Sequence, residues 1–429
     1  MSSTLPTPSS SSGHSLVGTS SAIPDKLRSL TAISPAEKLT CAGLFIPVTG
    51  PARSPARNHI ARAVPYPELS LDTTCDSLRA AFMKEPIRFA LIGCGEIGRL
   101  RAEALAQMPG FRLSVVSDVD RSRAQALADR FGPRTDVEWH RAIADDVDAV
   151  IVSTPPPLHA EMCIEALERG KHVLCEKPLA RNLQECRQIL QASQGAGRHL
   201  ATGFNYRFYP AIATAREILL SGQIGELDHI RSYAGHPGGR EFTHPWVHDV
   251  TVMGGGALVD NGIHILDLTR HFLGEVAEVK GFRTGHVWRF EGCEDNAFAL
   301  LKSREGKVAT VQASWSEWRG YRFWIEVFGT RGCVRASYPP MLAEATWTEK
   351  PGDRMHRKSF FFPVFQVVER LRSYRWTVVR SFVEELSRFA GAIAGEKNEA
   401  ATGFDGLRVV EIAHAVYESS ESGRSVLLA

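Results

Sequence analysis

A glycine-rich turn between a predicted strand and a predicted helix constrains the fold of this chain more than any other feature. The apolar run 87–92 ends in a G-x-G-x-x-G pattern, and a helical stretch follows over residues 99–108. A second predicted strand, over 112–117, ends in Asp118, which lies 20 residues after the third glycine. Strand, glycines, helix, second strand and acid together form the dinucleotide-binding arrangement of an α/β fold.

Each glycine of this turn meets a separate steric need. Gly93 permits a tight turn, Gly95 lets backbone N–H groups approach a pyrophosphate, and Gly98 lets the helix pack close to the strand. Glu96 and Ile97 lie at the predicted helix N-terminus, where the positive end of the helix dipole faces the phosphates. These five residues are predicted to bind the cofactor. The alternative is an ordinary glycine turn in an α/β domain that binds no nucleotide.

The cofactor predicted at this turn is NAD. Asp118 would accept hydrogen bonds from the adenine ribose hydroxyls, and its carboxylate repels a 2′-phosphate. Arg121 lies nearby in the sequence and weakens this preference, so NADP is the alternative cofactor. If the domain binds no nucleotide, Asp118 is only a solvated cap.

Alternating strands and helices continue after the turn. Helices are predicted over 121–131 and 159–169, and strands over 149–153 and 172–175. Repeated βα units produce a parallel sheet with helices on both faces. Residues 86–205 are therefore predicted to form a Rossmann domain that binds NAD(P).

Residues 206–429 are predicted to form a second domain, of the α+β class, which binds substrate and supports oligomerisation. Its predicted strands are 229–233, 276–283, 297–301, 308–316 and 323–328. We expect an open, mostly antiparallel sheet, followed by C-terminal helices. Both faces of the strand 323–328 are largely apolar, so we expect a homodimer or homotetramer to form through this sheet.

The N-terminal 82 residues differ in composition from the rest of the chain. The first 24 residues contain nine Ser, three Thr and three Pro, and no Asp, Glu, Lys or Arg. Such a segment cannot bury enough apolar surface to offset the entropy of ordering it, so we expect residues 1–82 to be a disordered extension. We favour a working start at Met83 over an organelle transit peptide, because the first arginine is Arg28.

Composition excludes several classes of partner. Lys plus Arg (50) against Asp plus Glu (48) gives a formal net charge of +2, so no overall field attracts nucleic acid or an anionic membrane. No apolar stretch reaches the roughly 20 residues of a membrane-spanning helix. The eight cysteines show no paired zinc spacing, which predicts reduced thiols in a cytoplasmic protein. A small-molecule partner is expected.

Three motifs, in order, make the chain similar to a known family. After the glycine turn come Glu176-Lys177-Pro178 and then D-x-G-x-H-x-x-D from Asp260 to Asp267, with a related tail over 402–408. On these residues the chain resembles the Gfo/Idh/MocA oxidoreductase family, named for glucose-fructose oxidoreductase and inositol dehydrogenase. The resemblance is close over residues 86–340. Residues 351–374 match none of the family motifs.

The resemblance implies a role for each matching residue. The implied catalytic residues are Lys177, Asp260 and His264. The loops after the strands 149–153 and 172–175 lie at the carboxyl ends of a parallel sheet, where ligands bind. From these loops, the residues expected at the cofactor are Thr154, Pro155, His159, Glu176 and Lys177. The residues expected at the substrate are Arg207, Trp246, Asp260 and His264.

The spacing of Asp260 and His264 suits proton transfer. Four residues apart, they would share one helix face, and an imidazole with a pKa near 6.5 can take a hydroxyl proton at neutral pH. Asp267 is expected to pair with an arginine such as Arg270. Zinc-type binding by Asp260, His264, His244 and His248 is the rival chemistry. We rank it lower and expect no metal, because ordinary members of the family need none.

The expected function is NAD(P)-dependent oxidation of a secondary alcohol in a sugar, a cyclitol such as inositol, or a related polyol. His264 would remove the hydroxyl proton, Lys177 would hydrogen-bond the same oxygen, and Asp260 would orient substrate hydroxyls or His264. Two alternatives stay open. One is a non-catalytic NAD-dependent ligand sensor, and the other is a reductase of an unsaturated bond, similar to biliverdin reductase.

Overall fold

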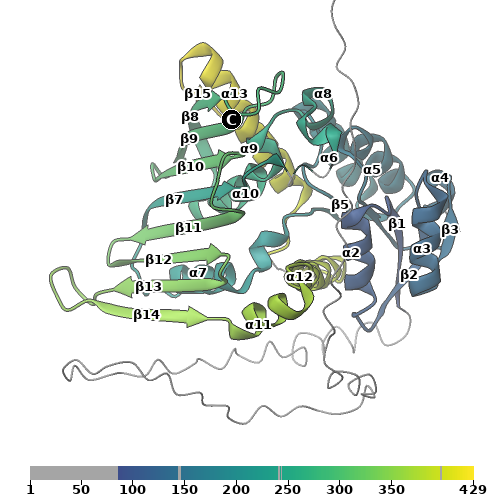
Figure 1. Ribbon diagram of the computed structural model, residues 1–429, viewed down its shortest axis with the longest axis horizontal. Helices are drawn as coiled ribbons and strands as arrows, with labels where there is room; N and C mark the ends of the chain where they lie inside the picture. Colours follow the sequence, from purple (N-terminus) through teal and green to yellow (C-terminus); the bar gives the residue numbers. More distant parts are fainter. Residues whose placement is uncertain (1–85, 144–145, 240–241, 243, 397–398) are drawn as a thin grey trace, which may run out of the picture. The chain divides into compact units, whose positions relative to one another are not determined.

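The computed structural model describes residues 86–429, except 144–145, 240–241, 243 and 397–398. The predictions for residues 1–82 and for a start at Met83 lie outside the described residues. Two sheets dominate this part of the chain (Figure 1). No helix among the described residues is long and apolar enough to cross a membrane.

The first sheet has six strands in the order β3-β2-β1-β4-β5-β6, and all are parallel. Its strands are β1 Ile87–Ile92, β2 Phe111–Ser117, β3 Arg134–Asp136, β4 Ala149–Val152, β5 His172–Cys175 and β6 Leu200–Thr202. The helices between them are α2 Glu96–Leu105, α3 Arg121–Phe131, α4 Trp139–Ala142, α5 His159–Glu168 and α6 Leu183–Ala196. The four predicted strands form as β1, β2, β4 and β5, which confirms the predicted parallel sheet. Its central strands are almost wholly buried.

The second sheet has nine strands in the order β14-β13-β12-β11-β7-β10-β9-β8-β15. Its strands are β7 Leu227–Gly235, β8 Val276–Thr284, β9 Asn296–Ser303, β10 Val308–Ser314, β11 Arg322–Gly329, β12 Gly332–Tyr338, β13 Leu342–Trp347, β14 His356–Phe361 and β15 Val426–Leu427. Neighbours are antiparallel except β7 and β10, which are parallel. The prediction of a mostly antiparallel sheet is confirmed.

One face of the second sheet is covered by helices, including α7 Pro210–Leu220, α10 Gly262–Leu273 and α13 Gly403–Ser422. Burial alternates along β9, where Ala297, Ala299 and Leu301 face the helices and Phe298 and Leu300 face away. Phe298 is 41% exposed and Leu300 56% exposed. The face of the sheet that the helices leave open therefore carries large apolar side chains in contact with solvent.

Helix α12, Arg375–Ile393, packs against α2 of the first part, although it lies between β14 and β15 of the second sheet in the sequence. Its residues Phe382, Leu386 and Phe389 share a hydrophobic cluster with Phe89 and Leu91 of β1. Figure 1 shows α12 beside α2. The core of the nucleotide-binding part thus includes a helix from the region predicted as the second domain.

The region 351–374, which matched no family motif, forms the edge strand β14 and helix α11, Pro363–Arg372. Phe365 of α11 packs edge-on against Trp376, with ring centroids 5.0 Å apart. Val364 and Val367 of the same helix are 62% and 56% exposed, so α11 is attached by one face only.

Candidate active site

The glycine turn between β1 and α2 has the geometry of a phosphate cradle. Gly93 has φ +92°, and a Cβ at Gly98 would lie 1.9 Å from the Gly93 carbonyl oxygen, so both positions require glycine. A Cβ at Gly95, by contrast, would meet no atom within 4 Å. Helix α2 begins at Glu96 without a side-chain cap. The open space at Gly95 and the uncapped first turn fit a pyrophosphate.

Asp118 lies at the end of β2, beside this turn. Its Oδ2 accepts a hydrogen bond from the Cys94 N–H at 2.7 Å, and its Oδ1 accepts one from the Asp120 N–H at 2.8 Å. A carboxylate oxygen can accept more than one hydrogen bond, so both retain capacity for ribose hydroxyls. The backbone therefore fixes the orientation in which Asp118 would meet a nucleotide.

The loops after β4 and β5 are joined by His159, whose side chain is completely buried. One ring nitrogen lies 2.8 Å from the carbonyl oxygen of Thr154, and the other lies 2.9 Å from that of Pro178. Burial lowers the pKa of His159 below its usual value. His159 thus holds together the two loops that carry Thr154, Pro155 and Lys177. Both of its ring nitrogens lie beside backbone carbonyl oxygens, so its contact with the cofactor stays a prediction.

Two other predicted cofactor residues also have protein partners. The Glu176 carboxylate accepts a hydrogen bond from Arg101 Nε at 2.8 Å, and the Glu96 carboxylate pairs with Arg375 at 3.0 Å. For Glu176, this places the side chain in a buried ion pair rather than free for the cofactor. Arg101 was not identified from the sequence, because a charged residue in a helix normally indicates a solvated face.

Lys177 and Asp260 come together from the two parts of the chain. Lys177 Nζ donates to the backbone carbonyl of Asp260 at 2.8 Å and lies 3.7 Å from Asp260 Oδ1. The side chains are 22% and 21% exposed, so a substrate can reach both. The structure brings these two predicted catalytic residues into one site.

The Asp260 carboxylate is held by two residues that sequence reasoning missed, His236 and Trp315. His236 Nδ1 accepts the Gly238 N–H at 3.1 Å, so Nε2 carries the proton and donates to Asp260 Oδ2 at 3.2 Å. Trp315 Nε1 donates to the same oxygen at 3.0 Å. Burial opposes ionisation of Asp260. The hydrogen bond from His236, the charge of Lys177 and the Trp315 N–H nevertheless hold its pKa at about 2.

His264 is almost completely buried, at 7% exposure, and stacks on Tyr206 with ring centroids 4.0 Å apart. Its Nδ1 has no hydrogen-bond partner among the described residues. Burial lowers the pKa of His264 well below 6.5, and the positive charge of Lys177 lowers it further. The imidazole is therefore neutral at neutral pH, which is the form a general base needs.

Asp260 and His264 lie on different helices, contrary to the single helix face that we expected. Helix α9, Ala257–Asp260, ends at Asp260, and α10 begins at Gly262 after Asn261. The hydrogen bonds of the Asp260 carboxylate go to His236 and Trp315 instead of to His264. Of the two roles predicted for Asp260, orienting His264 therefore has no hydrogen bond to support it.

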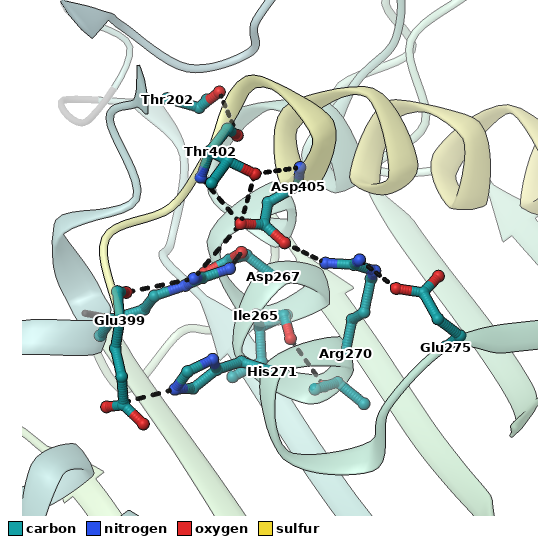
Figure 2. A network of polar contacts seen from close by, with 11 residues as sticks. Thr202, Ile265, Asp267, Arg270, His271, Glu275, Glu399, Thr402 and Asp405 are labelled. Atoms are coloured by element: carbon teal, nitrogen blue, oxygen red, sulfur yellow. Dashed lines mark hydrogen bonds and ion pairs between the residues drawn. The ribbon is translucent and has the colours of Figure 1, made fainter. Parts of the chain in front are cut away.

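Arg207 is not placed to bind substrate, which corrects our expectation. It is buried, and its Nε donates to Asp267 Oδ2 at 2.8 Å, while Nη1 lies 3.6 Å from Asp405 Oδ2. Asp267 does pair with an arginine, as predicted, but the partner is Arg207. Arg270 pairs with Asp405 and Glu275 instead, as Figure 2 shows.

Two of the histidines proposed as zinc ligands, His244 and His248, stack on aromatic side chains. His244 stacks on Trp246 at 5.8 Å between ring centroids, and His248 stacks on Phe290 at 4.1 Å. Across the described part of the chain, no group of three His, Cys, Asp or Glu side chains could hold a metal ion. Trp246 is partly buried and packs on the core, so its contact with substrate stays a prediction.

The chain matches two family models over the regions just described. Residues 87–204 match the model described as "Oxidoreductase family, NAD-binding Rossmann fold", and residues 212–335 match "GFO/IDH/MocA C-terminal domain". The second match ends before β14 and α11.

Curated proteins and solved structures agree with these models. Myo-inositol 2-dehydrogenase of Thermotoga maritima is 31% identical over 351 residues, covering 80% of this chain and 98% of that protein. Inositol 2-dehydrogenase of Rhizobium meliloti is 28% identical over 347 residues, covering 80% of this chain and 99% of that protein. The structure of a levoglucosan dehydrogenase in complex with NADH and L-sorbose is similar with a TM-score of 0.72 and 25% identity, covering 80% of this chain and 99% of that one. The chain therefore belongs to the GFO/IDH/MocA oxidoreductase family and is an NAD-dependent oxidoreductase.

Proposed function

We propose that the protein oxidises a secondary alcohol of a sugar, a cyclitol such as inositol, or a related polyol. The observation that carries the proposal is the contact of Lys177 with Asp260 at a partly exposed position, with the buried, neutral His264 near enough for both charges to act on its pKa. A neutral imidazole can accept a hydroxyl proton, and a cation can stabilise the negative charge that develops on the oxygen. NAD bound at the glycine turn supplies the acceptor for the hydride of the alcohol carbon.

Each residue has a defined task in this proposal. His264 accepts the hydroxyl proton, since burial keeps its imidazole neutral. Lys177 donates a hydrogen bond to the same oxygen and stabilises the negative charge that develops there. Asp260 is ionised and holds the Lys177 ammonium through its backbone carbonyl and its carboxylate. His236 and Trp315 keep that carboxylate in place.

The relatives support the substrate class. The two inositol 2-dehydrogenases are about 30% identical to this chain, and levoglucosan dehydrogenase acts on a sugar derivative according to its name. Lys177, Asp260 and His264 would have no evident task in a ligand sensor without turnover. Neither alternative function has an observation in its favour.

A substrate screen tests the proposal. The purified protein should form NADH, measured by nicotinamide absorbance, with at least one member of a panel of inositols and pyranoses. The variant His264→Gln should lose this activity while retaining NADH binding. Failure of the whole panel in the presence of NAD and NADP would contradict the proposal.

We also propose that two copies of the chain associate through the exposed face of the second sheet. Phe282 pairs with Phe298 across β8 and β9, and these residues are 57% and 41% exposed. With Leu300 they form an apolar surface that a second copy would cover. Light scattering should give the mass of a dimer or tetramer. Phe298→Glu should shift it toward the monomer, whereas Gln194→Glu, at an exposed position on α6 outside this sheet, should leave it unchanged.

A reducing compartment such as the cytoplasm is the location we propose. The six cysteines of the described residues are all free, and five of them are buried. Fluorescence of a tagged chain in cells would test the location, and an oxidising compartment would contradict it.

A further inference from the structure

Arg101 of α2 is completely buried and contacts two carboxylates. Its Nε and Nη2 lie 2.8 and 2.7 Å from Glu176 Oε1, and its Nη1 donates to Glu385 Oε2. The guanidinium carbon also lies 3.6 Å from the centroid of the Phe382 ring. A buried charge is tolerated only when it is paired, so these contacts hold one another in place.

The two carboxylates come from distant parts of the sequence. Glu176 directly precedes Lys177 in the loop after β5, and Glu385 lies on α12, which packs against α2. Close packing surrounds the pair, since a Cβ at Gly203 would lie 2.9 Å from Arg101 Nη2 and 3.0 Å from Glu176 Oε2. Arg101 therefore connects α12 to the loop that carries the lysine.

The contacts continue from this loop to the active site. The Lys177 N–H faces Glu176 Oε2 at 3.4 Å, and Lys177 Nζ donates to the Asp260 carbonyl at 2.8 Å. The Arg101 charge also contributes to lowering the pKa of His264, after burial and Lys177. Arg101 thus acts on both proposed catalytic groups without lying at the exposed part of the site.

Glu385 is an unusual partner for a purely structural ion pair. Its Oε1 is buried and has no hydrogen-bond partner among the described residues. Burial raises the pKa of Glu385 to about 7, although the charge of Arg101 opposes this shift. A glutamine would fill the same space without a buried charge. A structural role alone therefore does not explain the free-energy cost of burying the Glu385 carboxylate.

We propose that Arg101 and Glu385 are positioning residues, which hold the Glu176-Lys177 loop so that the Lys177 ammonium lies at Asp260. This inference rests on the proposed function in assigning Lys177 to the reacting oxygen. Glu385 orients the guanidinium, the guanidinium fixes the Glu176 carboxylate, and the backbone of residues 176–177 sets the direction of the lysine. Without the Glu385 carboxylate, Lys177 keeps its ammonium group but is held less firmly in its orientation toward Asp260.

The test compares Glu385→Gln and Glu385→Asp with Glu384→Gln, a partly buried neighbour on the same helix. Glu385→Gln should lower kcat about 10- to 100-fold, because small displacements of a catalytic group have effects of this size. NADH affinity, measured by fluorescence, should change little. Glu385→Asp should recover part of the loss, and Glu384→Gln should behave as the wild type.

Amide hydrogen exchange of the loop provides a readout that does not depend on turnover. In Glu385→Gln, the amides of Glu176, Lys177 and Leu179 should exchange faster than in the wild type, while the amides of β1 should exchange at the wild-type rate. If the wild type oxidises no polyol, this exchange alone decides the inference, and only the proposed function fails. Unchanged kcat and unchanged loop exchange in Glu385→Gln would overturn the inference. So would a loss of kcat matched by an equal loss of NADH affinity.

Discussion

Two polar clusters that share helix α10 differ in how their charges are matched. The first is defined by Arg207, Asp267, Arg270 and Asp405. Arg207 pairs with Asp267 and lies 3.6 Å from Asp405, and Arg270 pairs with Asp405, the last pair being drawn in Figure 2. In the second, Lys177 lies 3.7 Å from the nearest Asp260 carboxylate oxygen, and His264 Nδ1 has no partner among the described residues. We call the first the matched cluster and expect it to stabilise the fold. We call the second, in which His264 lacks a partner, the unmatched cluster and expect it to bind and deprotonate a ligand, as the proposed function requires.

The two clusters should differ most in the effect on kcat of removing the proposed base, His264. His264→Gln should lower kcat by about 10²- to 10⁴-fold, the usual contribution of general-base catalysis. NADH affinity and melting temperature should change little, because the glycine turn and Asp118 lie on other loops. Steady-state kinetics with fluorescence titration checks this, and activity within twofold of the wild type would remove His264 from the mechanism.

Asp267→Asn should show the reverse pattern. Removing one partner of a buried ion pair leaves Arg207 with only the more distant Asp405 carboxylate and should lower the free energy of unfolding by about 3 kcal/mol. The folded fraction should retain nearly normal kcat. Urea unfolding and kinetics on the same samples measure both quantities, and the double variant Arg207→Met, Asp267→Leu should recover stability. A large loss of kcat at unchanged stability would assign Asp267 to the catalytic site.

Asp118→Asn should alter cofactor preference by a smaller amount. Its charge opposes a 2′-phosphate by about 1 kcal/mol or more, so removing it should narrow the preference for NAD over NADP by roughly tenfold. Asparagine retains one acceptor oxygen for the Cys94 or Asp120 N–H. Titration with both cofactors tests this, and tighter binding of NADP by the wild type would contradict it.

The pH profile should show the smallest difference. Because burial lowers the pKa of His264, the neutral imidazole persists as the pH falls below 6.5. The acid limb of kcat/KM should therefore have its midpoint below 6.5, and activity should be lost only as the pH falls through the lowered pKa. A midpoint above 6.5 would mean that another group is the base.

The parallel sheet and the cofactor turn could be predicted from sequence because their signals are local. Gly93, Gly98 and Asp118 lie within one βαβ unit, and short-range geometry determines their roles. Arg207 could not be assigned in this way. Its partners Asp267 and Asp405 lie far away in the sequence, and an arginine near a domain junction fits a substrate site and an ion pair equally well.

Residues that act through long-range contacts were missed for the same reason. His236 and Trp315 hold Asp260 from the ends of β7 and β10, which are neighbours only because the sheet places them in parallel. Arg101 and Glu385 meet because α12 packs beside α2. The sequence of α12 repeats apolar residues at helical spacing, from Val379 through Phe382 and Leu386 to Phe389, which indicates a core helix but not which core it joins.

A double-mutant cycle on Lys177 and His264 tests the central claim most directly. If both act on one oxygen, the double variant Lys177→Ala, His264→Ala should be far less impaired in kcat than the product of the two single effects. Its NADH affinity should stay close to that of the wild type. Independent, multiplicative losses of kcat, or full activity in either single variant, would contradict the assignment of the unmatched cluster as the catalytic site.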